Sequence, residues 1–408
     1  MRALQFFKSV PRYVLLKLLT VRTRRRYSVH IAPLRLCNVP EPKLPGSQWL
    51  RVAPRLSGIC GSDLATLTAK GSPYLAPLTS MPFVMGHEVV GNVIEAGRDV
   101  KSFSIGDRVV LHPALGCKVR GIDPPCEPCA GQCDALCRNV TRGVISSGIQ
   151  TGYCRDTGGG FSENFVAHES QLYPVPAEID DRAAVLLEPF ACAIHAALRV
   201  SVVEKDTVLV MGCGAIGLLT IAALRASGCR ARLVAVARHE HQRNLAAAVG
   251  ADEALSSRGP TIDRYRRWGQ ALDAEMIDPE LGKPAVIGGA AATFDCVASS
   301  ESIDDGIRFT RSGGTFVLVG MPGIPKGIDW TPLWFKELKL LASYAYGPEP
   351  RAEGKDTFTV AIDWMRTLAP RLVTLVGAPL PLTAFRAAFR AALDTHSSGA
   401  AKTVFQFS

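Results

Sequence analysis

Residues 208–217 read Val-Leu-Val-Met-Gly-Cys-Gly-Ala-Ile-Gly, an apolar run that ends in three glycines spaced G-x-G-x-x-G. The run predicts a buried strand, and the stretch from Leu218 to Ala226 predicts a helix after the glycines. Glycines between a strand and a helix permit a tight turn and let backbone amides approach a pyrophosphate. A Gly-rich turn in an unrelated α/β fold is the alternative. The residues expected at the pyrophosphate are Gly212, Gly214, Ala215, Ile216 and Gly217.

The pattern of apolar, Gly and Pro residues differs on the two sides of this turn. Downstream, apolar strands such as 233–236 and 315–319 alternate with helical patterns, which is typical of a parallel sheet. We therefore predict a Rossmann doubly wound parallel-sheet cofactor domain over residues 188–345.

Residues 1–187 carry a different pattern. Short β-branched runs such as 89–94 and 107–111 are separated by Gly and Pro, which predicts an all-β, barrel-like domain. The tail 346–408 ends in an apolar strand at 403–405, and we expect it to return to the first domain. The predicted class is α/β plus β.

Length and composition are those of a globular protein with two or more domains. The chain has 408 residues, of which 47% are hydrophobic and 20% charged. It contains no run of about 18 uncharged apolar residues that would predict a transmembrane helix. The N-terminal sequence MRALQFFKSV lacks a signal-peptide pattern, so we expect a cytoplasmic location.

The net charge of +9 is partly local, because residues 12–26 interleave six Lys and Arg residues with Val and Leu. A basic amphipathic stretch can bind a membrane surface or an acidic partner, but we favour a solvated helix packed on its own domain. The other charges are dispersed and no recognition motif is present. We therefore expect neither a nucleic-acid nor a membrane partner.

Five of the twelve cysteines lie between positions 117 and 137, and three of them read C-x2-C-x7-C. Closely spaced thiolates on a loop are most often ligands of a structural zinc ion. A disulfide framework is the alternative, but it is typical of small secreted domains rather than a long chain without a secretory signal. The five cysteines are Cys117, Cys126, Cys129, Cys133 and Cys137.

A second set of metal-binding residues lies upstream, in Cys60-Gly-Ser-Asp and Gly-His87-Glu. A thiolate and an imidazole on different loops are reasonable ligands of a catalytic zinc ion, which needs three protein ligands and an open position.

The strand at 233–236 continues into Ala237 and Arg238, where NAD-binding domains place an acidic residue for the ribose 2′-hydroxyl. Losing the carboxylate removes repulsion against a 2′-phosphate, and a guanidinium offers it a bidentate partner. This favours NADP. In the alternative, Arg238 stacks on the adenine and Glu240 holds the ribose of NAD.

The order and spacing of these motifs resemble the zinc-dependent medium-chain dehydrogenase/reductases, the superfamily of alcohol, polyol and threonine dehydrogenases. The likeness covers nearly the whole chain and includes Gly-Gly-Phe-Ser-Glu at 159–163 and the segment 313–320, with Gly320 at the cofactor. It implies a GroES-like β-barrel catalytic domain beside the Rossmann domain. It also implies a homodimer or homotetramer that transfers a hydride between a secondary alcohol or polyol-like substrate and NADP(H). The alternatives are a zinc-free quinone or enoyl reductase and an inactive NADP-binding relative.

The resemblance assigns roles to single residues. Cys60 and His87 would bind catalytic zinc, and Ser62 would begin a proton relay. Asp63 would orient a zinc ligand. Glu88 would coordinate transiently or hold the zinc-bound water.

The third catalytic ligand separates branches of the superfamily. Ethanol-type enzymes use a second cysteine, whereas the polyol branch uses a glutamate before a proline. This chain has Glu188-Pro189, so we assign Glu188, with Cys192 as its rival. The histidine that ends the relay in ethanol-type enzymes has no counterpart among residues 64–66.

The structural zinc lobe, residues 117–137, departs from the usual spacings x2, x2 and x7, because Asp123 stands at the expected first ligand. The fourth ligand must be Cys117, Cys133 or Asp123. Thiolates dominate structural sites, and Cys133 would leave only a tight loop on each side. We therefore assign Cys117, Cys126, Cys129 and Cys137.

Overall fold

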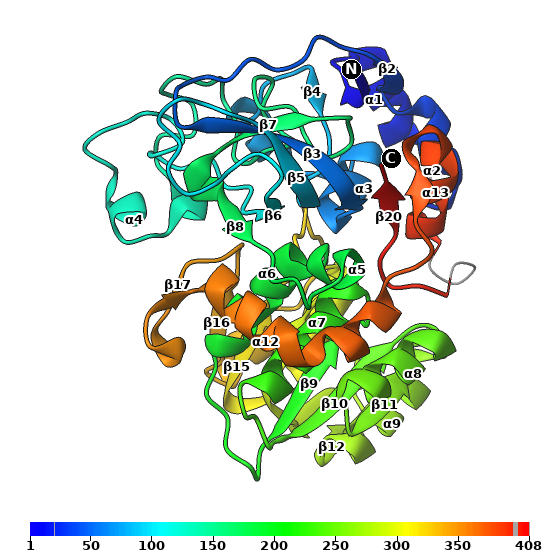
Figure 1. The fold of residues 1–408 in the computed structure, drawn as a ribbon. Coiled ribbons are helices and arrows are strands. Elements are labelled where there is room, and N and C mark those ends of the chain that lie inside the picture. Colours follow the sequence, from blue (N-terminus) through cyan, green and yellow to red (C-terminus); the bar gives the residue numbers. More distant parts are fainter. Residues whose placement is uncertain (20, 395–398, 408) are drawn as a thin grey trace. The chain divides into compact units, whose positions relative to one another are not determined.

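The computed structural model describes residues 1–19, 21–394 and 399–407, and the chain forms two compact units (Figure 1). The first unit comprises Met1–Glu188 and Tyr346–Ser408, and the second comprises Pro189–Ala345. The chain thus leaves the first unit after Glu188 and returns to it at Tyr346.

The first unit is built on a seven-stranded sheet in the order β19-β20-β3-β5-β6-β8, with β7 paired to β3. All of its pairs are antiparallel except β19 with β20. Alternate side chains of these strands, such as Val89 and Val93 of β5, are buried in one apolar core. The strands are β3 (Trp49–Gly58), β5 (Glu88–Ala96), β6 (Arg108–Leu111), β7 (Phe165–His168), β8 (Leu172–Pro174), β19 (Leu380–Pro381) and β20 (Val404–Gln406).

A second core of the first unit contains Phe161, Phe389 and Phe405, which draw the C-terminal segment onto the N-terminal one. The smaller sheets are β2-β1-β4 and β17-β18. Their strands are β1 (Arg2–Phe6), β2 (Leu34–Asn38), β4 (Phe83–Val84), β17 (Pro348–Glu349) and β18 (Lys355–Asp356). The helices are α1 (Val10–Leu18), α2 (Val21–Ile31), α3 (Gly61–Leu67), α4 (Glu127–Ala130), α5 (Asp181–Ala184), α12 (Thr357–Leu372) and α13 (Phe385–Leu393).

The second unit has a six-stranded, wholly parallel sheet in the order β11-β10-β9-β14-β15-β16. Strand order therefore reverses beside β9, as in doubly wound dinucleotide-binding folds. The strands are β9 (Thr207–Met211), β10 (Arg232–Ala237), β11 (Glu253–Ser256), β14 (Ala290–Asp295), β15 (Thr310–Leu318) and β16 (Lys339–Ala342), with the hairpin β12 (Ala274–Ile277) and β13 (Ala285–Gly288). The helices are α6 (Leu187–Leu198), α7 (Ala215–Ala226), α8 (Glu240–Val249), α9 (Thr261–Ala271), α10 (Ser300–Phe309) and α11 (Thr331–Phe335).

The predicted fold class is confirmed, with an antiparallel β unit and a parallel α/β unit. Helix α7 begins at Ala215, three residues before the predicted start, because Gly214 already serves as its N-cap. The basic segment forms two helices, α1 and α2, where a single helix was expected. No helix within the described ranges combines the length and apolarity needed to cross a bilayer.

Candidate active site and metal centres

Cys60 lies where β3 gives way to α3, as the N-cap residue of that helix. Its backbone N–H donates to Asp63 Oδ2 at 2.9 Å, which fixes the first turn. Asp63 is fully buried, and this burial raises its pKa to about 6, although His87 and the Cys60 amide favour the anion.

His87 is placed by a glycine before it. Gly86 has φ 97°, and a Cβ there would lie 2.6 Å from Phe161 Cδ1, so the turn requires glycine. His87 is 3% exposed, with Nδ1 3.9 Å from Asp63 Oδ1 and Nε2 3.5 Å from Ser62 Oγ. Burial opposes its protonation, but the charges of Cys60 and Asp63 raise the pKa of His87 to about 10.

The potential ligand atoms of Cys60, His87 and Glu88 all lie within 4.8 Å of one another. Glu88 is already engaged, because both of its carboxylate oxygens are 2.7 Å from Lys402 Nζ. Both side chains of this ion pair are buried. Glu88 is therefore held by a residue from the C-terminal end of the chain.

Glu188, in the first turn of α6, is also buried. Burial raises its pKa to about 7, and the Tyr346 hydroxyl donates to Glu188 Oε1 at 2.9 Å. Its charge acts on His87, but Glu188 is not one of the three residues with ligand atoms within 4.8 Å. Cys192, one turn further along α6, belongs to neither potential metal-binding group among the described residues.

The donors of this buried cluster suit a divalent cation. Burial raises the pKa values of Asp63 and Glu188, and the nearby positive charges of His87 and Lys402 offset it only in part. Asp63 Oδ1 and His87 Nδ1 are buried and make no hydrogen bond. Thiolate, imidazole and carboxylate are donors that zinc accepts, and a zinc ion bound here would add positive charge.

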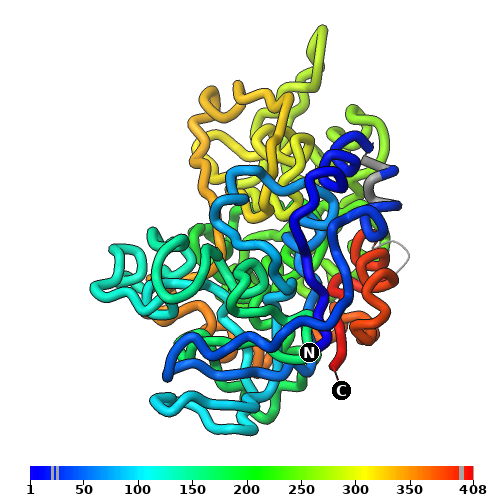
Figure 2. Tube along the Cα trace, turned by 90° about the horizontal axis from the view of Figure 1, so that it is seen from above, coloured from blue at the N-terminus to red at the C-terminus, as the bar shows by residue number. Residues whose placement is uncertain are grey.

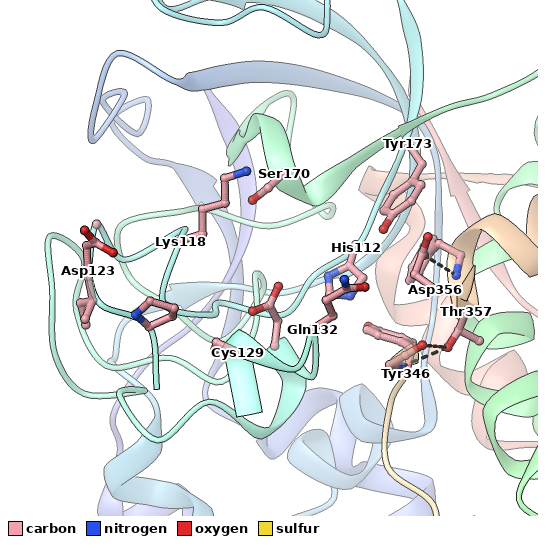
Figure 3. Close-up of a pocket in the computed structure, with 16 residues that line it drawn as sticks. His112, Lys118, Asp123, Cys129, Gln132, Ser170, Tyr173, Tyr346, Asp356 and Thr357 are labelled. Atoms are coloured by element: carbon pink, nitrogen blue, oxygen red, sulfur yellow. Dashed lines mark hydrogen bonds between the residues drawn. The ribbon is translucent and has the colours of Figure 1, made fainter. Parts of the chain in front are cut away.

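Tyr346 is fixed by aromatic neighbours at the wall of a cavity of about 680 Å³ (Figure 3). Its ring centroid is 4.6 Å from that of His112 and 4.9 Å from that of Phe358. These contacts hold the hydroxyl that donates to Glu188. The sequence analysis did not identify Tyr346, because nothing local links position 346 to position 188.

Tyr153 lies near Ser62. The sequence contains no counterpart of the histidine that ends the proton relay in ethanol-type enzymes. The Ser62 side chain favours ionisation of the Tyr153 hydroxyl, which is 3.2 Å from Thr66 Oγ1. The ring of Tyr153 lies 6.0 Å from that of His87, and burial raises the pKa of Tyr153. The hydroxyl groups of Ser62 and Tyr153 thus both lie near His87, and Tyr153 continues to Thr66.

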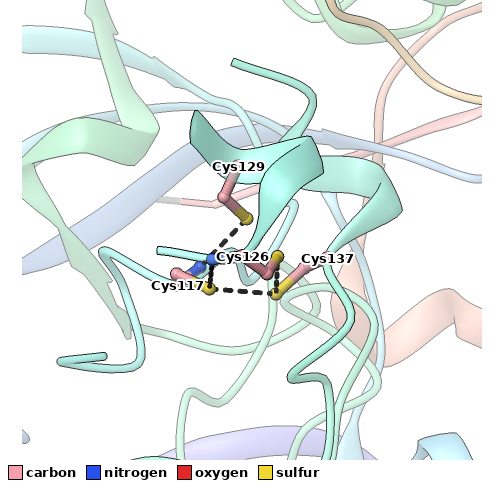
Figure 4. Close-up of side chains that lie close together, drawn as sticks. All are labelled: Cys117, Cys126, Cys129 and Cys137. Carbon is pink, nitrogen blue, oxygen red and sulfur yellow. Dashed lines mark hydrogen bonds between the residues drawn. The ribbon is translucent and has the colours of Figure 1, made fainter. Parts of the chain in front are cut away.

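The cysteine-rich lobe gathers four sulfur atoms (Figure 4). Potential ligand atoms of Cys117, Cys126, Cys129 and Cys137 lie within 4.8 Å of one another, and every cysteine is free. The Cys117–Cys137 and Cys126–Cys137 sulfur separations are 3.6 and 4.0 Å. A tetrahedron with zinc–sulfur bonds of about 2.3 Å has edges of about 3.8 Å, so the spacing suits zinc.

Backbone amides around the lobe point at these sulfur atoms, as they do around thiolates. The N–H groups of Cys126 and Asn139 donate to Cys117 Sγ and Cys137 Sγ, each at 3.3 Å. Cys133 is outside the group, and its thiol faces the Gly131 carbonyl at 3.6 Å. The folded lobe thus brings in Cys117 instead of Cys133.

The glycine turn of the second unit leaves open space where a pyrophosphate is expected. A Cβ at Gly217 would lie 1.8 Å from the Gly212 carbonyl oxygen, which explains glycine there. A Cβ at Gly214 would meet no atom within 4 Å, so the N-terminus of α7 is accessible, with Ala215 and Ile216 in its first turn. Gly320 packs against Ala298, whose Cβ would lie 2.7 Å from an added Cβ, and both Gly320 and Gly212 adjoin Val297.

Ala237 ends β10 in a buried position, and Arg238 is exposed directly after it. The Ser257 N–H donates to the Ala237 carbonyl at 3.0 Å, which brings the end of β11 alongside. Arg258 then lies 3.1 Å from His239 Nδ1. The structure therefore adds a second arginine beside Arg238, which only the pairing of β10 with β11 reveals.

Comparisons with known proteins agree with this architecture. Residues 46–177 match the alcohol dehydrogenase GroES-like domain, and residues 215–367 match the zinc-binding dehydrogenase domain. The L-idonate 5-dehydrogenase of Vitis vinifera is 28% identical over 332 residues, covering 79% of this chain and 78% of that protein. The L-threonine 3-dehydrogenase of Shewanella frigidimarina is 29% identical over 310 residues, covering 76% and 80%.

A solved structure of a candidate zinc-binding dehydrogenase from Sinorhizobium meliloti, bound to NADP, is 25% identical. It covers 92% of this chain and 95% of its own, with a TM-score of 0.68. The similarity thus extends across both units.

Proposed function

The chain belongs to the zinc-dependent medium-chain dehydrogenase/reductase superfamily, and from this premise we propose that it oxidises secondary alcohols or polyols, or reduces the matching carbonyls, with NADP(H). The cluster of partly buried Cys60 with buried His87 and Glu188 carries this proposal. A zinc-free quinone or enoyl reductase has no need of such a donor set.

We propose that Cys60, His87 and Glu188 hold the catalytic zinc. Lys402 occupies both oxygens of Glu88, and Glu188 stands before Pro189, as the third ligand of the polyol branch does. When bound, zinc supplies a Lewis acid that lowers the pKa of a substrate hydroxyl, and the nicotinamide accepts or returns the hydride. Asp63 orients His87, whose Nδ1 faces its carboxylate.

The proton follows the hydroxyl chain that begins at Ser62. Ser62 Oγ accepts a proton on the substrate side and passes one to the hydroxyl of its neighbour Tyr153. Tyr153 passes a proton to Thr66 Oγ1, 3.2 Å away, which is only partly buried. Each hydroxyl gains one proton and loses one, so the relay needs no ionised tyrosine, which the raised pKa of Tyr153 disfavours.

NADP is the proposed cofactor. The glycine turn at Gly212–Gly217 offers backbone amides and the α7 N-terminus to the pyrophosphate. Arg238 and Arg258 offer two guanidinium groups to a 2′-phosphate, and no carboxylate stands at Ala237 to repel it. NAD remains the alternative, with Glu240 at the ribose.

We propose that Cys117, Cys126, Cys129 and Cys137 hold a second, structural zinc. All four positions are thiols with amide donors around them, so the set is complete without a water ligand.

A homodimer is the proposed assembly. Strand β16 ends the parallel sheet and pairs only with β15 among the described strands. Leu340 on β16 is 47% exposed, and Trp334 and Phe335 of the preceding segment are 69% and 65% exposed. An unpaired edge with exposed apolar side chains is a site for pairing with a second chain. The cytoplasmic location expected from the sequence remains a prediction.

One experiment tests the proposed activity. Purified protein is analysed for bound metal and assayed with secondary alcohols, polyols and amino alcohols, each with NADP and NAD. We expect two zinc ions per chain and turnover with NADP. One zinc ion and activity only on quinones or enoyl substrates would favour the zinc-free reductase, and cofactor binding without turnover would favour the inactive relative.

A further inference from the structure

Helices α1 and α2 form an insertion at the tip of a β-hairpin. Strands β1 and β2 pair antiparallel as far as Phe6 opposite Leu34, where a loop of about two to five residues would suffice. The chain instead inserts residues 7–33 as two helices. The matched family domain begins only at residue 46, so this insertion lies outside the matched sequence.

Helix α2 anchors the insertion to the first unit, and α1 is its outer element. Val29 of α2 and Ala32, just after the end of this helix, are buried in an apolar core that also contains residues of α13. Helix α13 packs against α2 (Figure 2). Only Leu16 of α1 is buried, with 1% exposure. Helix α1 therefore contributes little to the core of the unit.

The apolar side chains of α1 lie on the outside. Val10, Val14 and Leu18 are 61%, 47% and 78% exposed, and Leu15 beside them is 47% exposed. Residues four apart share a helix face, so these side chains form one exposed stripe along α1. A contiguous apolar stripe on the surface indicates an interaction site.

Positive charge is concentrated in the same segment. Residues 1–40 contain nine Lys or Arg residues and no Asp or Glu. The remaining sequence has 37 residues of each sign, so this segment accounts for the whole net charge of +9. The side chains of Arg22, Arg24, Arg25 and Arg26 lie outside the described residues, and their contribution here is one of sequence.

Neighbouring helix α13 extends this basic character. It carries Arg386 and Arg390, both exposed, and no acidic residue. Lys17 of α1 is also exposed. The described surface around the apolar stripe therefore presents cations.

We propose that the α1–α2 insertion docks on the surface of a bilayer that contains anionic lipids. The stripe of Val10, Val14, Leu15 and Leu18 enters the boundary between headgroups and acyl chains, and the surrounding Lys and Arg residues bind lipid phosphates. This proposal differs from the expectation in the sequence analysis, which favoured a helix packed on its own domain. A nucleic acid has no use for the apolar stripe, and a second copy would bring two positively charged segments together.

Vesicle flotation with the purified full-length protein tests the proposal. We expect binding to mixed phosphatidylglycerol–phosphatidylcholine vesicles at low salt, binding to pure phosphatidylcholine at least about tenfold weaker, and loss of binding as salt rises. Absence of binding to the anionic vesicles at low salt overturns the proposal.

Two variants separate the apolar and ionic contributions. The double variant Val14→Ser, Leu18→Ser should bind anionic vesicles at least about tenfold more weakly, since it removes the exposed stripe. Lys17→Glu with Arg386→Glu should weaken binding at least about tenfold. Because all four side chains are exposed, the thermal unfolding midpoint should stay unchanged.

Matched controls lie elsewhere on the surface. Val203→Ser with Leu281→Ser replaces one exposed valine and one exposed leucine, at 56% and 91% exposure, outside the insertion. This control should bind as the parent protein does. The proposal is overturned if the control variant and the Val14→Ser, Leu18→Ser variant lose vesicle binding equally. The proposal is also overturned if the Val14→Ser, Leu18→Ser variant binds vesicles as the parent protein does and heparin competes fully with the vesicles. That result would assign the surface to an acidic polymer.

Discussion

The two cysteine-containing groups of the first unit differ in how their charges are compensated. The lobe group consists of four sulfur atoms from one short segment, and local backbone amides point at them. The group at Cys60 and His87 mixes a thiol, an imidazole and carboxyl groups, and its partners include Lys402 and Tyr346 from the end of the chain. A complete set of thiolates suits a metal that supports the fold, whereas a mixed and incomplete set suits one that meets a substrate.

Removing a donor from the mixed group gives the largest expected effect. Cys60→Ala or His87→Ala should lower kcat/KM by at least about a thousandfold, because the Lewis acid is lost. The thermal unfolding midpoint and NADP binding should change little. Steady-state kinetics, zinc analysis and calorimetry check this. Full activity in either variant would contradict the proposed catalytic zinc. An unfolded variant would mean that this group supports the fold as the lobe group does.

The lobe group should show the opposite pattern. Cys117→Ser should lose one of two zinc ions and lower the unfolding midpoint by about 10 °C or more, because a structural site contributes to folding. Cys133→Ser is the matched control, since its thiol faces the Gly131 carbonyl, and it should retain both zinc ions and the midpoint. If Cys133→Ser loses zinc and Cys117→Ser does not, the assignment of the fourth ligand is wrong.

The cofactor-binding turn adds a third site to the comparison. Its specificity is set by the charge of side chains and involves no metal ion. Arg238→Ala should weaken NADP binding by about ten- to a hundredfold and leave NAD binding nearly unchanged, because a charge-assisted contact to the 2′-phosphate is lost. Isothermal titration with both cofactors measures this. Lys205→Ala, an exposed change elsewhere in the unit, serves as control. Tighter binding of NAD than NADP by the unmodified protein would refute the preference.

Tyr346 offers the smallest and most specific test of the mixed group. Tyr346→Phe keeps the ring between His112 and Phe358 but removes the hydroxyl that donates to Glu188. Zinc affinity and kcat should each fall by about tenfold, the usual cost of losing a partner of a metal ligand. Tyr173 lines the same cavity and stacks on Phe358, so Tyr173→Phe is the control for loss of a tyrosine hydroxyl. An unchanged zinc affinity in Tyr346→Phe would separate Glu188 from the metal.

Local patterns in the sequence determined much of this protein. A strand followed by G-x-G-x-x-G and a helical stretch predicted the parallel α/β unit, because turn, strand and helix preferences act over a few residues. The spacing of cysteines in the lobe predicted a metal group for the same reason. The motifs around Cys60 and His87 were recognisable because each is a short segment in a fixed order.

Only the tertiary structure decided which residues meet. Lys402 reaches Glu88, Tyr346 reaches Glu188 and Tyr153 reaches Thr66, and each pair is distant in sequence. The same holds for the outward apolar stripe of α1, since amphipathic periodicity shows that a helix has an apolar face but not what covers it. These contacts follow from how the strands and helices pack, and pairing and burial between distant segments leave no local trace in the sequence.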